Sequence, residues 1–490
     1  MLQTNSLKKA EEAMKETVKK MNKQYRLGYH IMAPANWIND PNGLVQFNGE
    51  YHVFFQHHPY DENWGPMHWG HVKSKDLVQW EHLPIALAPG DACDKDGCFS
   101  GSAVDNNGEL TLIYTGHHYT DKEKDIFFQN QNIAVSKDGI SFEKVGENPV
   151  IAEPPADSSH HFRDPKVWKH NNEWYMILGN ATREETGRVI LYKSADLRKW
   201  EYIGVLAESD GTLGFMWECP DFFELDGKYV LLFSPQGMEA EEERYQNLFQ
   251  TGSLIGEYNY ENNEFVYGEF TELDHGHDFY AVQTLLDDKG RRIAIGWMDM
   301  WEADMPTKKD GWAGALTLPR ILTLSEDGKL LMNPVEELIQ LRETAYPALQ
   351  NKSVADQYFY EINEALLEVK AVFDLNSTAA ESICLNLMGS SSEALKIRYN
   401  KNTQKLTLDC SAYGKIKDGV RTVKLSASEE LSLRIFIDRS SIELFVNDGE
   451  ATMTSRIYPK EERAGIEIVA ENGVAEVTEF TAWQLKDCWE

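Results

Sequence analysis

The sequence predicts an all-β protein with two parts, a five-bladed β-propeller followed by a C-terminal β-sandwich. Turn-forming residues recur about every sixty residues over the first two thirds of the chain, and a second short signature recurs out of phase with them. Over residues 355–490 both patterns are absent and alternating apolar and polar residues dominate, which is typical of a β-sandwich.

Five predicted hairpin turns define the repeat. Each turn is followed by a run rich in aliphatic and aromatic residues, such as residues 51–55 and 229–233, and turns between such runs are typical of β-hairpins. Successive turns are 54 to 65 residues apart. The turns lie at Gly49, Gly108, Glu173, Gly227 and Gly290.

The second signature is a serine two residues before an aspartate, with an aromatic residue four positions after the aspartate. We expect it to form a turn between the outer strands of each unit, with the aromatic ring packed between units. Two hairpins in one period describe a four-stranded blade, and five copies fit residues 30–332. A β-sandwich with chance similarity is the alternative, but it explains no such period. The three copies are Ser74-Asp76-Trp80, Ser136-Asp138-Phe142 and Ser194-Asp196-Trp200.

Two further segments flank the predicted propeller. Residues 1–29 form an N-terminal extension, in which apolar residues at helical spacing predict an amphipathic helix over about residues 6–22. Residues 333–354 are predicted to be a helical linker, because Asn333 and Pro334 resemble a helix N-cap followed by a proline at the first helical position.

Composition narrows the class of protein. The formal net charge of −31 argues against nucleic acid and anionic membranes as partners, because both require a basic surface. No stretch is apolar enough to span a membrane, and charged residues interrupt the N-terminus, so no signal peptide is expected. The six cysteines are then expected to be reduced thiols. We expect a cytoplasmic monomer or homodimer.

Three carboxylates occupy one position of the repeat. Asp40, Asp164 and Glu218 each lie nine residues before a predicted turn, near the start of the first strand of a blade. In a propeller this strand lies nearest the axis, so the three acids are expected to meet in one pocket. Two carboxylates in one pocket are the minimum equipment for glycoside hydrolysis. The alternative is that each acid only caps a turn, which explains one such residue more readily than three.

The neighbours of the acids suggest different protonation states. Glu218 has Trp217, Cys219 and Pro220 beside it, and this apolar setting would raise its pKa and suit a general acid if the pocket is dry. Asp40 lies between Asn39 and Asn42, whose amides could keep it ionised.

A metal site is not expected. His68 with His71, and His275 with His277, have the spacing of paired ligands, but no third and fourth ligands accompany either pair.

Four segments together resemble glycoside hydrolase family 32, which contains invertases, fructanases and sucrose-6-phosphate hydrolases. The resemblance covers nearly the whole chain. It implies a retaining hydrolase with a covalent fructosyl-enzyme intermediate and no metal or cofactor. The segments are Trp-Ile-Asn-Asp-Pro-Asn-Gly at 37–43, Arg-Asp-Pro at 163–165, Glu-Cys-Pro-Asp at 218–221 and Asp-Arg-Ser-Ser-Ile-Glu at 438–443.

The resemblance also implies a role for each acid. Asp40 looks like the nucleophile that attacks the anomeric carbon of fructose, Glu218 like the acid/base, and Asp164 like the stabiliser of the transition state. Retention requires the Asp40 and Glu218 carboxyls to lie roughly 5–5.5 Å apart. Eight further positions are implied to bind substrate: Trp37, Asn39, Gln56, Trp64, Phe99, Ser100, Arg163 and Tyr280.

Residues 234–237 and 245–247 look like the bacterial sucrose-6-phosphate hydrolase branch of the family. The expected activity is therefore that of a β-fructofuranosidase acting on sucrose, sucrose 6-phosphate or both, although no phosphate-binding motif is evident. A fructan hydrolase acting on inulin or levan is the main alternative. A non-catalytic sugar-binding propeller would be expected to lack one of the acids, and an arabinan- or xylan-cleaving propeller would not carry the segment at 37–43.

Overall fold

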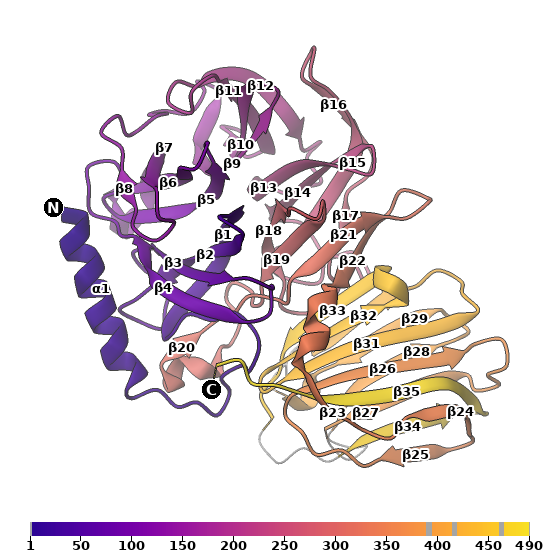
Figure 1. Ribbon diagram of the computed structural model, residues 1–490. Coiled ribbons are helices and arrows are strands. Elements are labelled where there is room, and N and C mark those ends of the chain that lie inside the picture. The colour runs from indigo at the N-terminus through magenta and orange to yellow at the C-terminus, as the bar shows by residue number, and fades with distance from the viewer. Residues whose placement is uncertain (1, 389–393, 414–418, 460–464, 490) are drawn as a thin grey trace.

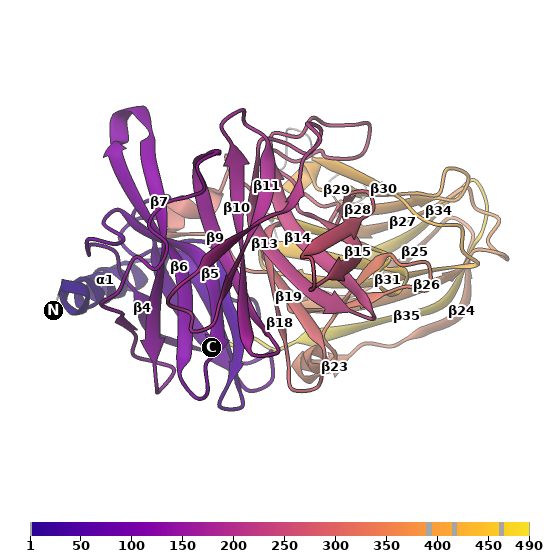
Figure 2. The same ribbon diagram turned by 90° about the horizontal axis from the view of Figure 1, so that it is seen from above.

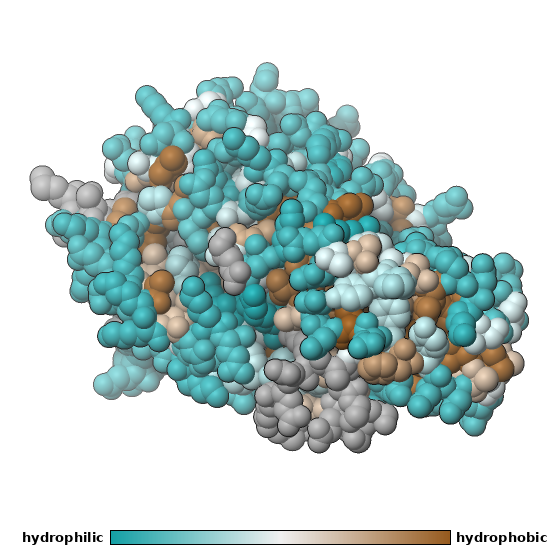
Figure 3. Space-filling view, turned by 60° about the horizontal axis from the view of Figure 1, so that its bottom comes forward, coloured by the Kyte–Doolittle hydropathy of each residue, from teal (hydrophilic) through white to brown (hydrophobic). Residues whose placement is uncertain are grey.

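The structure is a computed structural model that describes residues 2–388, 394–413, 419–459 and 465–489. Nearly all of its regular elements are β-strands. The chain forms two bodies of sheet that lie side by side (Figure 1). Hydrophilic residues cover most of the face seen in Figure 3, and apolar residues form small separate groups there, as the net charge of −31 leads one to expect.

The first body is a ring of five sheets, here called the N-terminal ring. In each sheet the strands follow one another from the centre outward (Figure 1). The innermost strands contact one another in chain order, and the last contacts the first. These strands are β1 (Asn36–Phe47), β5 (Gly97–Asp105), β9 (Ser158–His170), β13 (Met216–Leu225) and β18 (Tyr280–Leu286).

Hydrogen bonds close the ring, because β20, which comes late in the chain, pairs in parallel with β1. The other strands of the first three sheets are β2 (Glu50–His58), β3 (His68–Ser74), β4 (Trp80–Leu87) and β20 (Trp312–Ala313); β6 (Leu110–Asp121), β7 (Ile126–Ser136) and β8 (Glu143–Lys144); and β10 (Glu173–Thr182), β11 (Gly187–Ser194) and β12 (Glu201–Glu208). Those of the last two sheets are β14 (Lys228–Gln236), β15 (Gly252–Asn259), β16 (Glu264–Tyr267) and β17 (Thr271–Glu272); and β19 (Arg292–Trp297), β21 (Arg320–Leu324) and β22 (Leu330–Pro334).

Both repeated turns lie where the sequence predicts them. Each of the five hairpin turns joins an innermost strand to the second strand of its sheet. Each serine-aspartate turn joins the third strand to the fourth. Asp138 shows why that turn needs an aspartate: its carboxylate accepts backbone N–H groups of Ile140 and Ser141, and these bonds lower its pKa to about 2.

Every innermost strand carries a β-bulge at the same level. An extra residue in one strand breaks the alternation of side chains and can direct two nearby side chains into the same space. Asp164, Cys219 and Ala281 at three of these bulges have positive φ angles of 64°, 49° and 54°. The register shifts lie between Ile38 and Pro41, Phe99 and Gly101, Arg163 and Lys166, Glu218 and Asp221, and Tyr280 and Gln283.

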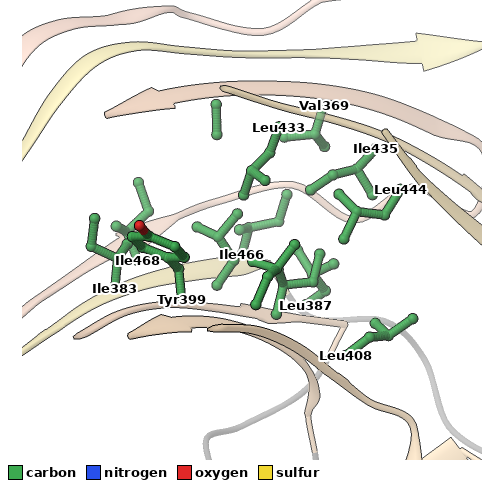
Figure 4. Close-up of a cluster of buried hydrophobic side chains, with 14 of the residues drawn as sticks. Val369, Ile383, Leu387, Tyr399, Leu408, Leu433, Ile435, Leu444, Ile466 and Ile468 are labelled. Carbon is green, nitrogen blue, oxygen red and sulfur yellow. The ribbon is translucent and has the colours of Figure 1, made fainter. Parts of the chain in front are cut away.

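The second body consists of two sheets packed face to face. Val369, Leu433, Ile435 and Leu444 from one sheet meet Ile383, Leu387, Tyr399, Leu408, Ile466 and Ile468 from the other in a buried apolar layer (Figure 4). One sheet contains β23 (Arg342–Ala345), β24 (Leu349–Val354), β26 (Leu367–Asp374), β31 (Glu430–Asp438), β32 (Ser441–Val446), β33 (Ala451–Arg456) and β35 (Ala475–Leu485). The other contains β25 (Gln357–Tyr360), β27 (Ser382–Leu387), β28 (Leu395–Asn400), β29 (Lys405–Asp409), β30 (Val420–Lys424) and β34 (Ile466–Glu471).

The helical segments differ in detail from their predicted positions. Helix α1 (Leu2–Val18) begins and ends about four residues before the predicted helix, and it packs against β4 with Ala10 fully buried. The short helix after the ring is a 3₁₀ helix, Glu336–Leu341. Asn333 and Pro334 do not cap it as expected, because both belong to β22 and pair with β21. The other 3₁₀ turns are Lys122–Lys124, Pro306–Asp310, Ser411–Tyr413 and Asn447–Gly449.

Buried ion pairs join the two bodies. The carboxylate of Asp438 accepts hydrogen bonds from the backbone N–H groups of Gly28 and Tyr29 and contacts His30 at 2.8 Å. Glu443 contacts the other nitrogen of His30 at 2.8 Å and Arg320 at 2.7 Å. The segment at 438–443 therefore holds the start of the ring against the second body.

Candidate active site

The three acids of the repeat meet at one cavity of about 280 Å³. Asp40 comes from β1, Asp164 from β9 and Glu218 from β13, so the convergence predicted from the repeat is confirmed. Within the described residues, no three histidine, cysteine or acidic side chains are grouped so as to hold a metal ion. The cavity is lined by Asn39, Asp40, Gln56, Trp64, Phe99, Ser100, His117, Tyr119, Asp125, Phe127, Gln129, His161, Arg163, Asp164, Glu218 and Trp301.

Two side chains orient the carboxylate of Asp40. Ser100 Oγ donates to Oδ2 at 2.6 Å, and Asn39 Nδ2 donates to Oδ1 at 3.0 Å. Burial raises the pKa of Asp40, the charge of Glu218 adds to the rise, and these two hydrogen bonds oppose it. Asn42 does not contribute as expected, because its amide lies against Gly101 and Gln56.

Glu218 is surrounded by hydrogen-bond donors. Arg163 donates from Nε and Nη2 to Oε1 at 3.0 and 2.8 Å. Gln236 and Tyr280 donate to Oε2 at 2.7 and 2.5 Å. The predicted apolar setting is therefore wrong. Neighbouring residues of a strand point to opposite faces, so Trp217 stacks on Phe233, away from the carboxyl.

Asp164 is a carboxyl whose pKa is raised to about 7. Burial is the largest cause, and the charges of Glu218 and Asp40 act in the same direction. Arg163, whose Nε lies 4.0 Å from Oδ2, and the backbone N–H of Cys219, which donates to Oδ2 at 2.9 Å, act in the opposite direction. Asp164 thus lies beside two further acids and one guanidinium, so it does not titrate as an isolated carboxyl.

Cys219 is a site residue that the sequence reasoning missed. Its thiol donates to Asp40 at 3.5 Å and to Asp164 at 3.6 Å. Burial and the charges of the three acids hold the pKa of the thiol well above its ordinary value, so the thiol keeps its proton and acts as a donor. The sequence indicated only an apolar neighbour of Glu218, because the bulge that turns the thiol toward the acids is a feature of the fold.

Six of the eight predicted substrate-binding residues line the cavity: Asn39, Gln56, Trp64, Phe99, Ser100 and Arg163. The other two lie behind it. The Trp37 indole donates to Asn39 Oδ1 at 2.7 Å, and the buried Tyr280 donates to Glu218. Trp37 and Tyr280 are thus placed to support residues of the cavity wall.

A second wall of the cavity was not predicted. The β6–β7 hairpin contributes His117, Tyr119, Asp125, Phe127 and Gln129 to it. This hairpin extends beyond the other strands of its sheet (Figure 2). The repeat gave no indication of it, because the extension lies at the opposite end of these strands from the predicted turn at Gly108.

Comparisons with known proteins agree with this arrangement. Residues 30–334 match the model of the glycosyl hydrolases family 32 N-terminal domain, and residues 336–484 match that of the family 32 C terminal. The chain is 46% identical to a sucrose-6-phosphate hydrolase of Escherichia coli over 93% of this chain and 94% of that protein. It is 44% identical to a raffinose invertase of the same species, again over 93% and 94%.

Two solved structures extend the comparison. The family 32 β-fructofuranosidase of Bombyx mori, determined as a mutant in complex with sucrose, is 39% identical with a TM-score of 0.87 over 99% of both chains. The sucrose-6-phosphate hydrolase of Lactobacillus gasseri is 29% identical with a TM-score of 0.88, over 98% of this chain and 97% of that one. With both family models matched over nearly its full length, this chain belongs to glycoside hydrolase family 32.

Proposed function

We propose that this protein is a β-fructofuranosidase that hydrolyses the fructosyl bond of sucrose, of sucrose 6-phosphate, or of both. The observation that carries the proposal is the meeting of Asp40, Asp164 and Glu218, from three separate strands, at one sugar-sized cavity. The family retains configuration, so the reaction proceeds through a covalent fructosyl-enzyme.

Asp40 acts as the nucleophile in this proposal. Its oxygen forms a bond to the anomeric carbon of fructose while the bond from that carbon to the glycosidic oxygen breaks. Ser100 and Asn39 orient the carboxylate for attack, since each holds one of its oxygens.

Glu218 acts as acid and then as base. It gives its proton to the departing glycosidic oxygen and later takes a proton from the water that attacks the fructosyl-enzyme. Arg163, Gln236 and Tyr280 donate to the two oxygens of the carboxyl and hold it in one orientation.

Asp164 stabilises the positive charge that develops on the fructosyl ring. Its pKa of about 7 in the free protein means that it carries a proton part of the time at neutral pH. Hydroxyl groups of bound fructose that donate to Asp164 favour its ionised form, in which it stabilises the transition state.

We also propose a domain organisation for the chain. The N-terminal ring is a five-bladed β-propeller, supported by five sheets whose innermost strands contact in a closed series, and the second body is a β-sandwich. We place the extension at 1–29, the propeller at 30–332 and the sandwich at 355–490. The predicted helical linker at 333–354 is divided between the two domains, because β22 ends at Pro334 in the ring and β23 and β24 pair with β35 in the sandwich.

We also propose a cellular location and an assembly state for the enzyme. Cys93, Cys98, Cys219, Cys384 and Cys488 are thiols in this structure, which supports a reducing, cytoplasmic location. Within the part of the chain that the structure describes, no helix has the length and apolar character needed to cross a membrane. A monomer or a homodimer remains the prediction for the assembly.

The test is hydrolysis of sucrose, sucrose 6-phosphate and inulin by the wild-type protein, with the products identified and Asp40→Asn as the inactive control. Release of fructose from either of the first two substrates supports the proposal. A folded wild-type protein that cleaves neither of them overturns it, and faster cleavage of inulin than of sucrose identifies a fructanase.

A further inference from the structure

The cavity has two walls of different origin. In the proposed function the fructosyl ring lies against Asn39, Gln56, Phe99 and Ser100, beside the nucleophile. The leaving sugar then faces the β6–β7 hairpin, here called the aglycone wall. The residues of that wall are His117, Tyr119, Asp125, Phe127, Gln129 and, from β9, His161.

Positive charge is scarce at this site. Recognition of a phosphate group ordinarily uses arginine or lysine side chains that donate charge-assisted hydrogen bonds. Of the sixteen residues that line the cavity, all within the described chain, Arg163 alone is an arginine or lysine. Its guanidinium is already engaged, with Nε and Nη2 on Glu218 and Nη1 on His161 Nδ1 at 2.8 Å.

The histidines of the aglycone wall do not supply the missing charge. Burial, and after it the charge of the neighbouring Arg163, lower the pKa of His117 to about 3 and that of His161 to about 2. His160, whose ring centre lies 4.2 Å from that of His161, also has a lowered pKa because of burial. These rings are therefore neutral at pH 7 and offer one N–H each at most.

The tip of the hairpin is acidic. Residues 121–125 carry two lysines and three acids, and Asp125 is the acid among them that lines the cavity. Lys124 is paired with Asp121 at 2.8 Å. Lys122 lies over the ring of Tyr119 at 5.7 Å and is the one cation of the tip near the cavity rim.

We infer that the aglycone wall selects an uncharged leaving sugar, so that sucrose is preferred over sucrose 6-phosphate, and that Asp125 is a residue that sets this preference. The inference rests on the proposed function and deepens it. A phosphate on the leaving glucose brings up to two negative charges toward Asp125, with no free arginine on the wall to offset the repulsion. The net charge of −31 adds to the repulsion at low salt.

The first test compares kcat/KM for sucrose and sucrose 6-phosphate with the wild-type protein. We expect the value for sucrose to be higher, and we expect the difference to shrink as ionic strength rises, because salt screens exposed charges. A tenfold or greater preference for sucrose 6-phosphate overturns the inference. Failure to cleave either substrate overturns the proposed function instead, so the two outcomes are distinguishable.

The second test uses Asp125→Asn, which removes one charge and keeps the shape of the side chain. Asp125 has a φ of 52°, and asparagine tolerates this left-handed conformation well. The ratio of kcat/KM for sucrose 6-phosphate to that for sucrose should rise about three- to tenfold, the size expected from removing one nearby charge in a wet site.

Two neighbouring variants serve as controls for this test. Glu123→Gln removes the same charge from a residue that does not line the cavity and should change the ratio by less than Asp125→Asn does. Lys122→Gln should lower the ratio only slightly. A collapse of sucrose 6-phosphate cleavage in Lys122→Gln contradicts the inference, because it identifies a phosphate site at the rim. An unchanged ratio in Asp125→Asn also contradicts it, because it shows that Asp125 does not set the preference.

Discussion

Tyr280 donates its hydroxyl to Oε2 of Glu218 at 2.5 Å, across 62 positions of sequence and between two sheets of the ring. The tyrosine is 1% exposed, and burial together with the charge of Glu218 holds its pKa well above the ordinary value. It therefore remains a hydrogen-bond donor throughout the physiological pH range. A fixed neutral donor on the acid/base holds its carboxyl in one orientation.

Tyr280→Phe removes this donor without emptying the space that the ring fills. Loss of one hydrogen bond to a charged group costs about 1.5–3 kcal/mol, so kcat should fall roughly 10- to 100-fold with a small change in KM. Steady-state kinetics measure the effect, and Tyr192→Phe, a buried tyrosine of another sheet, is the matched control. A fall confined to KM would assign Tyr280 to ground-state binding.

Asp40→Asn and Glu218→Gln should each lower turnover of sucrose by at least ~10³-fold, because each removes a group that takes part in bond making or proton transfer. Circular dichroism and thermal unfolding show whether the fold is intact. If either variant keeps near-normal turnover, the role of that residue is wrong.

Cys219→Ala removes the thiol that donates to Asp40 and Asp164. Hydrogen bonds to a carboxylate favour its ionised form, so their loss raises the pKa of both acids further. The acid limb of the kcat/KM profile should then move to higher pH, while activity on the alkaline side changes little. An unmoved acid limb indicates that the thiol only fills space.

The pKa of about 7 at Asp164 predicts how the wild-type enzyme responds to pH. If the transition state needs ionised Asp164, kcat/KM should rise with pH through the region around 7, and the apparent value belongs to the coupled set of acids. The Asp164→Ala variant should lose this rise and should lose more in kcat than in substrate affinity. A profile that keeps the same rise in Asp164→Ala assigns the titration to another group.

The ion pairs between the two bodies predict a second pH effect, on stability. The folded pKa of His30 is raised from 6.5 to about 9, so its contribution is complete below pH 6.5 and is lost between pH 6.5 and 9. The pKa of Glu443 is lowered from 4.5 to about 2, so its contribution is complete above pH 4.5 and is lost as pH falls toward 2.

The Tm of the wild-type protein, measured across pH, should therefore fall as the pH rises from 6.5 to 9. The His30→Gln variant should not show this fall. The variant should also be less stable by about 3–5 kcal/mol near neutral pH, because it leaves buried carboxylates without their partner. A wild-type Tm that does not fall between pH 6.5 and 9 contradicts the assignment.

The sequence was informative where one residue type repeats at one level of the fold. The hairpin turns and the convergence of Asp40, Asp164 and Glu218 follow from periodicity alone. The environment of Glu218 does not, because its donors Arg163 and Tyr280 come from neighbouring sheets of the ring.

The aglycone wall could not be predicted from the sequence for a different reason. Asp125 and Phe127 lie on a hairpin that is longer than the repeat requires, so the period gives no information about them. Patterns that recur identify shared structure, whereas the connections between the second and third strands differ in length from sheet to sheet.

The contacts of Asp438 and Glu443 with residues 28–30 have a consequence for how the protein is made. The segment that begins the ring finds its hydrogen-bond partners more than four hundred residues later in the chain. During synthesis on the ribosome, residues 28–30 therefore cannot form these contacts until the strand that carries Glu443 has emerged. The segment that begins the ring is thus among the last to reach its final contacts.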